Sequence, residues 1–155
     1  MNTQVTIAGV TFKNPVMTAS GTFGSGMEYV QFVDLNKLGA IVTKGVANVP
    51  WPGNPTPRVA ETYGGMLNAI GLQNPGVDKV IAEELPKLEK CFNKKVIANV
   101  SGFALEEYVE TASRLDKQDI VGMIEVNVSC PNVHGGGMAF GTSPCAAAEI
   151  TKAVK

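Results

Sequence analysis

Short apolar segments alternate with amphipathic segments along this chain, and the alternation predicts an α/β fold. Four apolar stretches predict buried strands, at Pro15–Ser20, Gly39–Lys44, Lys95–Asn99 and Gly122–Asn127. Apolar residues at helical spacing predict three longer helices, over residues 74–90, 105–115 and 143–155. Strand–helix units repeated in this way are typical of parallel strands covered by helices.

Capping residues and proline define the expected helix boundaries. A capping box of Ser25 and Glu28 predicts a short helix that ends near Asp34. Asn74 is the expected N-cap of the next helix, and Pro86 should kink or split that helix because proline has no N–H to donate.

Two segments fall outside the repeat. Val5–Ile7 and Val10–Phe12 flank Ala8-Gly9, which predicts a β-hairpin that caps one end of the fold. Residues 46–75 are rich in proline and glycine, so a long helix is excluded there. Because residues 66–72 are largely apolar, we expect an ordered loop over a site.

The predicted strands share one property, a polar residue at the carboxyl end: Ser20, Lys44, Asn99 and Asn127. Ligands of barrels and open α/β sheets bind at this end of parallel strands, so a shared polar site is expected. The last strand continues directly into Ser129-Cys130-Pro131-Asn132, which adds a thiol and a further amide. The glycines of residues 21–26 lack the spacing of a dinucleotide-binding turn.

Composition limits the classes of function. The chain has 155 residues, enough for one domain, and a net charge of -1 without a basic stripe, which argues against nucleic acid. No apolar run approaches the length of a membrane span, and the N-terminal residues do not resemble a secretory signal. Cys91, Cys130 and Cys145 lack Cys-x-x-Cys spacing, and His134 has no partner at ligand spacing, so we expect no metal site and a cytoplasmic protein.

Four motifs together resemble the dihydroorotate dehydrogenase family: Thr43-Lys44, Asn54-Pro-Thr-Pro-Arg58, Asn68-Ala-Ile-Gly-Leu-Gln-Asn74 and Asn127-Val-Ser-Cys-Pro-Asn132. His134-Gly-Gly and Ala139-Phe-Gly141 resemble the catalytic subunit of its class 1B, NAD-linked branch. The resemblance implies a (β/α)8 TIM barrel with flavin mononucleotide (FMN) at its top face, which oxidises dihydroorotate to orotate in pyrimidine biosynthesis. Residues 1–155 would be a single domain, the N-terminal half of that barrel with about four β/α units and the hairpin.

The resemblance also implies a role for individual residues. Cys130 would be the base that takes a proton from dihydroorotate while hydride passes to the flavin. The implied flavin contacts are Ser20, Lys44, Gly45, Asn99 and Asn127. The implied substrate contacts are Lys44, Asn68, Ala69, Ile70, Gly71, Leu72, Asn127 and Asn132.

A partner subunit follows from the class 1B resemblance. It would contain FAD and a [2Fe–2S] cluster and pass electrons to NAD⁺, with two catalytic subunits pairing inside a heterotetramer. Two other functions stay open: a cysteine-nucleophile enzyme with His134 as base, and an inactive half-barrel that serves as a structural or assembly module. The 155 residues by themselves are expected to be inactive and to hold flavin poorly.

Overall fold

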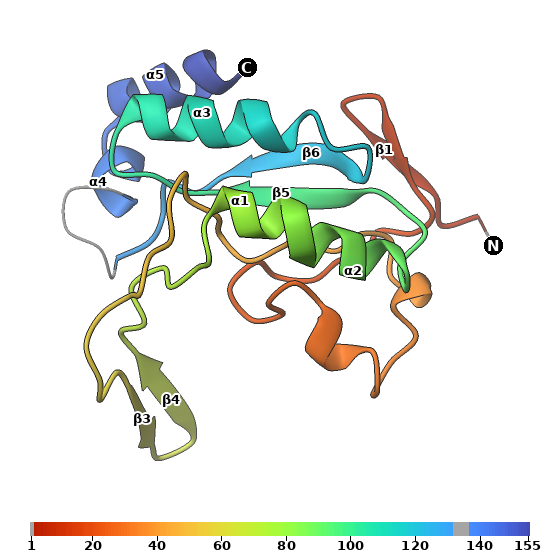
Figure 1. Cartoon of the computed structure of the whole chain (residues 1–155), viewed down its shortest axis with the longest axis horizontal. Coiled ribbons are helices and arrows are strands. Elements are labelled where there is room, and N and C mark those ends of the chain that lie inside the picture. Colours follow the sequence, from red (N-terminus) through yellow and green to blue (C-terminus); the bar gives the residue numbers. More distant parts are fainter. Residues whose placement is uncertain (1, 132–136) are drawn as a thin grey trace.

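A parallel pair of strands forms the centre of the computed structural model, which describes residues 2–131 and 137–155 (Figure 1). β5 (Val96–Val100) pairs with β6 (Val121–Val126) along its length. Two earlier segments extend the same parallel order through single bridges, from Val42 to Ile97 and from Met17 to Ala40. The segments therefore lie side by side in the order of the sequence.

The continuous strands predicted at 15–20 and 39–44 are wrong, since each segment is held by isolated bridges. Thr18 supplies the physical reason. Its hydroxyl accepts from the Val42 N–H at 2.9 Å and donates to the Val42 carbonyl at 3.3 Å, so a side chain takes the place of main-chain ladder bonds. Pro15 removes a further main-chain donor.

Helices cover one face of these strands. α3 (Leu105–Leu115) occupies the residues that the apolar spacing predicted, and α5 (Pro144–Val154) packs against it. Ser143 caps α5 by accepting from the Ala146 N–H at 3.4 Å, as the sequence suggested. A short helix, α4 (Met138–Gly141), precedes α5.

The predicted helix over residues 74–90 is divided. It comprises α1 (Val77–Lys79), a π-helical turn η3 (Val80–Glu84) and α2 (Leu85–Glu89). Pro86 lies in the first turn of α2, so the expected split occurs there. The predicted N-cap is wrong: Gly76 holds that position, and Asn74 uses its side-chain oxygen to accept from the Gly76 and Ala47 N–H groups, at 3.0 and 3.1 Å.

The predicted capping box is also wrong. Residues 27–29 form a 3₁₀ turn, η1 (Met27–Tyr29), whose N-cap is Gly26, and no side chain caps it. Ser25 instead donates to the Glu84 carboxylate of η3, far away in the sequence. A second 3₁₀ turn, η2 (Leu35–Lys37), follows and is capped by the Asp34 side chain.

Two antiparallel hairpins flank the parallel segments. β1 (Val5–Ile7) pairs with β2 (Val10–Phe12), and buried Phe12 covers the end of a small core formed with Ala40, Val42 and Ile97. β3 (Val59–Thr62) pairs with β4 (Gly65–Asn68) and projects from the body of the molecule (Figure 1). The sequence indicated an ordered loop there but not this hairpin.

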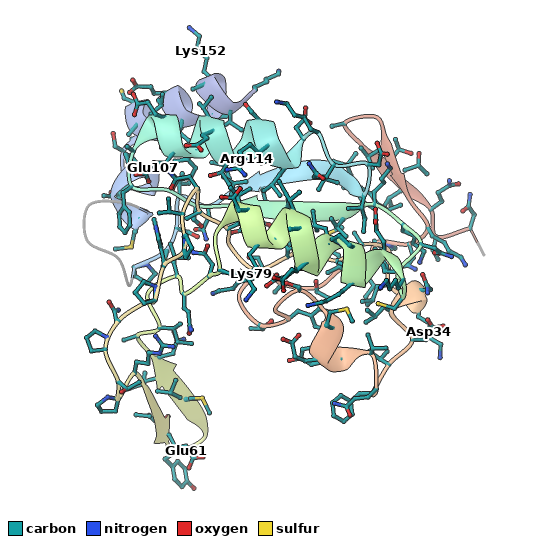
Figure 2. The ribbon with its side chains drawn as sticks, viewed as in Figure 1. Asp34, Glu61, Lys79, Glu107, Arg114 and Lys152 are labelled. Carbon is teal, nitrogen blue, oxygen red and sulfur yellow. The ribbon has the colours of Figure 1, made fainter. Side chains whose placement is uncertain are left out.

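The main core lies between the strands and the helices. Val96, Ala98 and Val100 of β5 point into it, together with Tyr108 and Leu115 of α3. Charged side chains such as Asp34, Glu61 and Lys152 lie on the outer surface (Figure 2). Arg114 of α3 pairs with Asp78 of α1 and with Glu110 at 3.7 Å. Within residues 2–131 and 137–155, no helix combines the length and hydrophobicity that crossing a membrane requires.

Candidate functional site

The strand face that points away from the helices changes from apolar to polar along each strand. Side chains two residues apart share a face, so Ile97 of β5 is followed on that face by Asn99. In β6, Met123 is followed in the same way by Glu125. In the neighbouring segment, apolar Val42 is likewise followed two residues later by charged Lys44. The small core therefore fills one end of this face, and polar groups collect at the carboxyl end.

A cavity of about 340 Å³ opens at this polar end. Its lining comes from five separate parts of the chain: Ser20, Gly21, Thr22, Lys44, Gly45, Asn68, Ile70, Gly71, Leu72, Asn99, Asn127, Ser129, Cys130 and Pro131. The structure thus brings together all the site residues named from the sequence except two. Ala69 lines a separate depression beside Arg58 and Leu67, and Asn132, like His134, lies outside the described residues.

A chain of side-chain hydrogen bonds crosses the floor of the cavity. Asn99 donates from Nδ2 to the Glu125 carboxylate, and its Oδ1 accepts from Asn127 Nδ2 at 3.2 Å. Asn127 Oδ1 accepts in turn from the Ser129 N–H at 3.2 Å and from the Ser129 hydroxyl at 3.3 Å. Since Asn99 is only 1% exposed, its amide is fixed by these partners and not by water.

The Thr43–Gly45 segment forms the neighbouring wall. Thr43 Oγ1 accepts from the Asn99 N–H at 3.2 Å, and the Lys44 N–H donates to the Gly24 carbonyl at 2.9 Å. A side chain at Gly45 would not fit, because its Cβ would lie 2.7 Å from Asn99 Oδ1 and 2.8 Å from Ser101 Oγ. Glycine therefore lets the main chain of residue 45 lie directly against these two polar side chains.

Residues 68–74 close the opposite side. Leu72 is 6% exposed and has a φ of 55°, a conformation that costs a bulky residue about 1–3 kcal/mol and is held here by packing. The Leu72 carbonyl accepts from Asn74 Nδ2 at 2.8 Å, and the Ile70 carbonyl accepts from the Asn54 N–H at 3.0 Å. This side of the cavity is therefore preformed by the protein's own bonds.

Cys130 follows the strand end that carries Asn127. It is partly buried, and its carbonyl accepts from the Met138 N–H at 3.0 Å, which ties the chain before residues 132–136 to α4. Tyr108 of α3 lies beneath, and burial raises the pKa of its hydroxyl, so the group stays protonated and donates to the Asn127 carbonyl. Cys91 and Cys145 do not line the cavity.

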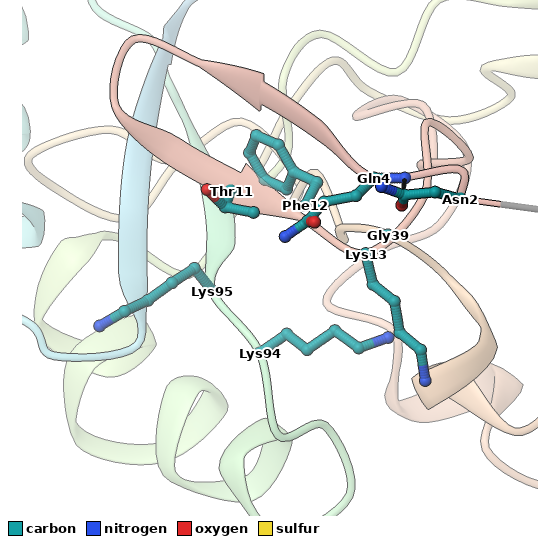
Figure 3. A pocket seen from close by; sticks show the side chains of 8 residues that line it. All are labelled: Asn2, Gln4, Thr11, Phe12, Lys13, Gly39, Lys94 and Lys95. Atoms are coloured by element: carbon teal, nitrogen blue, oxygen red, sulfur yellow. Dashed lines mark hydrogen bonds between the residues drawn. The ribbon is translucent and has the colours of Figure 1, made fainter.

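A second cavity of about 400 Å³ lies at the other end of the strands, beside β2 (Figure 3). Lys13, Lys94 and Lys95 give it a basic lining. Two of these ammonium groups already have partners, since Lys94 Nζ donates to the Asn36 carbonyl at 2.5 Å and Lys95 Nζ to the Asp119 carbonyl. Burial and nearby Lys13 lower the pKa of Lys94. These lysines are better explained as structural donors than as a ligand site.

Among the residues that the structure describes, no three His, Cys, Asp or Glu side chains lie close enough together to hold a metal ion. Sequence reasoning missed Glu125 and gave Ser129 no role, although both residues complete the chain of hydrogen bonds at the cavity floor. The sequence did contain a signal for Glu125. It lies two residues before Asn127 in a largely apolar strand, so the two side chains are expected on the same face.

Comparisons with known proteins agree with one another. The model of the dihydroorotate dehydrogenase family matches residues 2–155. The sequence is 64% identical over 155 residues to the "dihydroorotate dehydrogenase B (NAD(+)), catalytic subunit" of Lachnoclostridium phytofermentans and 59% identical to that of Alkaliphilus metalliredigens. Each match covers 100% of this chain and 51% of the relative, so the chain spans about half the length of these curated relatives.

The fold is similar to solved structures of the same family. Two crystal structures of DHODH from Eimeria tenella, one in complex with ferulenol and one ligand-free, give a TM-score of 0.77 at 21% and 20% identity. They cover 99% of this chain and 43% and 45% of the Eimeria chains. At this identity the likeness concerns the fold, whereas the family match rests on sequence. The chain belongs to the dihydroorotate dehydrogenase family.

Proposed function

We propose that this chain supplies the substrate-binding and proton-abstracting part of an enzyme that oxidises dihydroorotate to orotate in pyrimidine biosynthesis. The observation that supports this most is the gathering of Lys44, Cys130 and three asparagines around one cavity of about 340 Å³. These groups come from distant parts of the sequence, and a cation, amides and a thiol are the groups that this chemistry needs.

In this proposal the chain is one domain and comprises the first four β/α units of a (β/α)8 barrel, with the β1–β2 hairpin across its lower end. The parallel order of residues 17, 40–42, 96–100 and 121–126 supports it. So does the position of the cavity, since barrel enzymes bind ligands at the carboxyl ends of their strands.

The polar groups of the cavity fit the ring system of FMN. The main chain at Gly45 lies directly against Asn99 and Ser101, and the buried Ser101 hydroxyl has no hydrogen-bond partner among the described residues. Ser20, Lys44, Gly45, Asn99 and Asn127 line the cavity and would hold the flavin there. When bound, FMN would supply the acceptor for the hydride of dihydroorotate.

The chain's own residues would bind and deprotonate the substrate. The Lys44 ammonium would face the substrate carboxylate, and Asn68 and Asn127, with Asn132, would bond the ring carbonyl and N–H groups. The main chain of residues 69–72 would line the same pocket. A Cys130 thiolate would accept the proton from the ring carbon and become a thiol, while the electron pair of that C–H bond stays in the ring to form the new C=C bond.

The electron acceptor beyond the flavin is proposed from the relatives. Their names describe an NAD(+) enzyme and its catalytic subunit. We therefore propose an electron-transfer partner subunit with FAD and a [2Fe–2S] cluster, and a pair of catalytic subunits within the assembly.

Stopped-flow reduction of flavin in a full-length subunit that contains these 155 residues tests the function. Cys130→Ala should leave flavin bound and slow its reduction by dihydroorotate by about 10²–10⁴-fold, the usual weight of a general base. Cys145→Ala is the matched control, because this exposed thiol of α5 lies outside the cavity. A wild-type protein that binds no flavin, or does not react with dihydroorotate, would contradict the proposed function.

A non-catalytic assembly role is the second candidate, and the exposed β3–β4 hairpin favours it. Tyr63 is fully exposed and Met66 and Leu67 are about two-thirds exposed, so the hairpin offers apolar surface to another protein. Size-exclusion chromatography together with the visible absorption spectrum would separate the two roles. A colourless, stably associated complex would favour the assembly role.

A further inference from the structure

Glu125 faces the candidate site from the strand that leads to Cys130. It lies opposite Asn99 in the parallel register of β5 and β6, so the two side chains share a face. It also precedes Asn127 by two residues, which places all three side chains on that face. The Glu125 carboxylate accepts from Asn99 Nδ2.

This contact fixes the direction of the chain of hydrogen bonds at one end, and the Ser129 main-chain N–H, which can only donate, fixes it at the other. An ionised carboxylate can only accept, so Asn99 must turn its NH₂ group toward Glu125 and its oxygen toward Asn127. Asn127 must then donate from Nδ2 and turn its own oxygen toward Ser129. A carboxamide without such a partner can rotate by 180° and exchange its donor and acceptor.

We infer that Glu125 is a positioning residue that, together with the Ser129 N–H at the other end of the chain, fixes the orientation of the Asn99 and Asn127 carboxamides. The inference rests on the proposed function, since it gives these two amides a defined task there. With its oxygen bonded to Ser129, Asn127 keeps one N–H of its Nδ2 group for a ligand. The site is thereby set to receive a carbonyl oxygen at Asn127, as a pyrimidine-dione ring presents.

Three variants of the full-length protein separate this role from a general effect on folding. Glu125→Met replaces the carboxylate by an apolar side chain of similar length and so removes the acceptor. It should weaken orotate binding and slow flavin reduction. The combined loss should be about 100-fold, the size of effect that a small misplacement of a binding group has. Glu125→Gln keeps an acceptor oxygen and should restore most of this loss. Glu149→Gln, an exposed residue of α5, is the control and should behave as wild type.

The side-chain NH₂ resonances of Asn99 and Asn127 provide a readout that does not require activity. In Glu125→Met both sets of resonances should shift, because the first bond of the chain is lost. Should this variant fail to fold, Glu125→Gln still decides the question, since a neutral acceptor is weaker and the Asn99 protons should move upfield.

Three results would overturn the inference. The first is unchanged Asn99 and Asn127 resonances in a folded Glu125 variant. The second is a Met variant that binds orotate as wild type does. The third is a Gln variant as impaired as the Met variant, which would assign the effect to charge alone. A wild-type protein that does not react with dihydroorotate would refute the proposed function, yet the resonances would still report on Glu125.

Discussion

The buried hydroxyl of Tyr108 donates a hydrogen bond of 2.7 Å to the main-chain carbonyl of Asn127. Tyr108 belongs to α3, whereas Asn127 is the first residue after β6 and lines the candidate site. A single contact therefore joins the helical layer to the strand end from which the Asn127 side chain and Cys130 project. The Phe140 ring of α4 meets the Tyr108 ring edge-on at 6.0 Å and limits its movement.

Removal of this hydroxyl should loosen the strand end. We expect Tyr108→Phe to lower the free energy of unfolding by about 1–3 kcal/mol, because a carbonyl loses its partner in a partly buried place. Urea denaturation measures the change. Tyr29→Phe is the matched control, since the Tyr29 hydroxyl also donates to a carbonyl, that of Thr22 at 3.0 Å, but at an exposed position. Equal losses in the two variants would contradict the assigned role.

The same tyrosine should make stability depend on pH in alkaline solution. Burial raises the pKa of Tyr108 in the folded state, so on raising the pH the unfolded chain loses this proton first, near its ordinary pKa of about 10. The protonated Tyr108 hydroxyl therefore makes its full contribution to the free energy of unfolding below that pH, and the contribution declines above it. Because lysines titrate in the same range, the difference in unfolding free energy between wild type and Tyr108→Phe is the quantity to follow. A difference that does not change between about pH 9 and pH 11 would contradict this prediction.

Local patterns in the sequence predicted those parts of the fold that depend on neighbouring residues. The helical spacing of residues such as Leu105 and Leu115 predicted α3. The Ser143 cap of α5 was predictable because its hydroxyl lies three residues before the Ala146 N–H, from which it accepts a hydrogen bond. The Ser25 capping box failed because the hydroxyl has a partner 59 positions away, Glu84, which no local pattern reveals. The β3–β4 hairpin was missed because all its residues are exposed, which removes the alternation that marks a half-buried strand.

The candidate site shows the same division. Polar residues at the ends of apolar strands predicted Lys44, Asn99 and Asn127 as neighbours, because parallel strands place their carboxyl ends together. The role of Glu125 depends on the register between β5 and β6, which the sequence does not state. The separation of Ala69 from the cavity depends on the path of β4, in a hairpin that was not predicted.

An added methyl group at Gly45 should disturb the site more than the fold. In Gly45→Ala the new Cβ would approach both Asn99 Oδ1 and Ser101 Oγ within 2.8 Å, so the Asn99 amide must move. We expect a loss of stability of about 1–3 kcal/mol, as for other overpacked positions, and weaker flavin binding measured by fluorescence titration. Gly21→Ala is the control, since it lines the same cavity and its Cβ would meet nothing within 4 Å. Normal flavin affinity in Gly45→Ala would contradict the placement of the ring beside Asn99.

Arg58 should hold the wall of the cavity through the shape of its guanidinium group. The Arg58 Nη1 group donates to the Pro52 and Asn54 carbonyls, at 3.0 and 3.1 Å, and Nη2 donates to the Gln73 side chain. The forked group thus joins the two ends of the segment that contains the β3–β4 hairpin. A lysine keeps the charge but cannot reach three acceptors from one rigid plane.

We therefore expect Arg58→Lys to lower the free energy of unfolding by about 1.5–3 kcal/mol, the range for a lost hydrogen bond to a charged group. Cleavage between residues 52 and 73 in limited proteolysis should become faster, because the open form of this segment is more populated. Arg114→Lys is the matched control. Its ion pairs with Asp78 and Glu110 lie on the surface, so it should cost at most about 1 kcal/mol and leave cleavage at 52–73 unchanged. If both arginine variants cleave at the wild-type rate, the segment is held by the loop's main-chain bonds and not by Arg58.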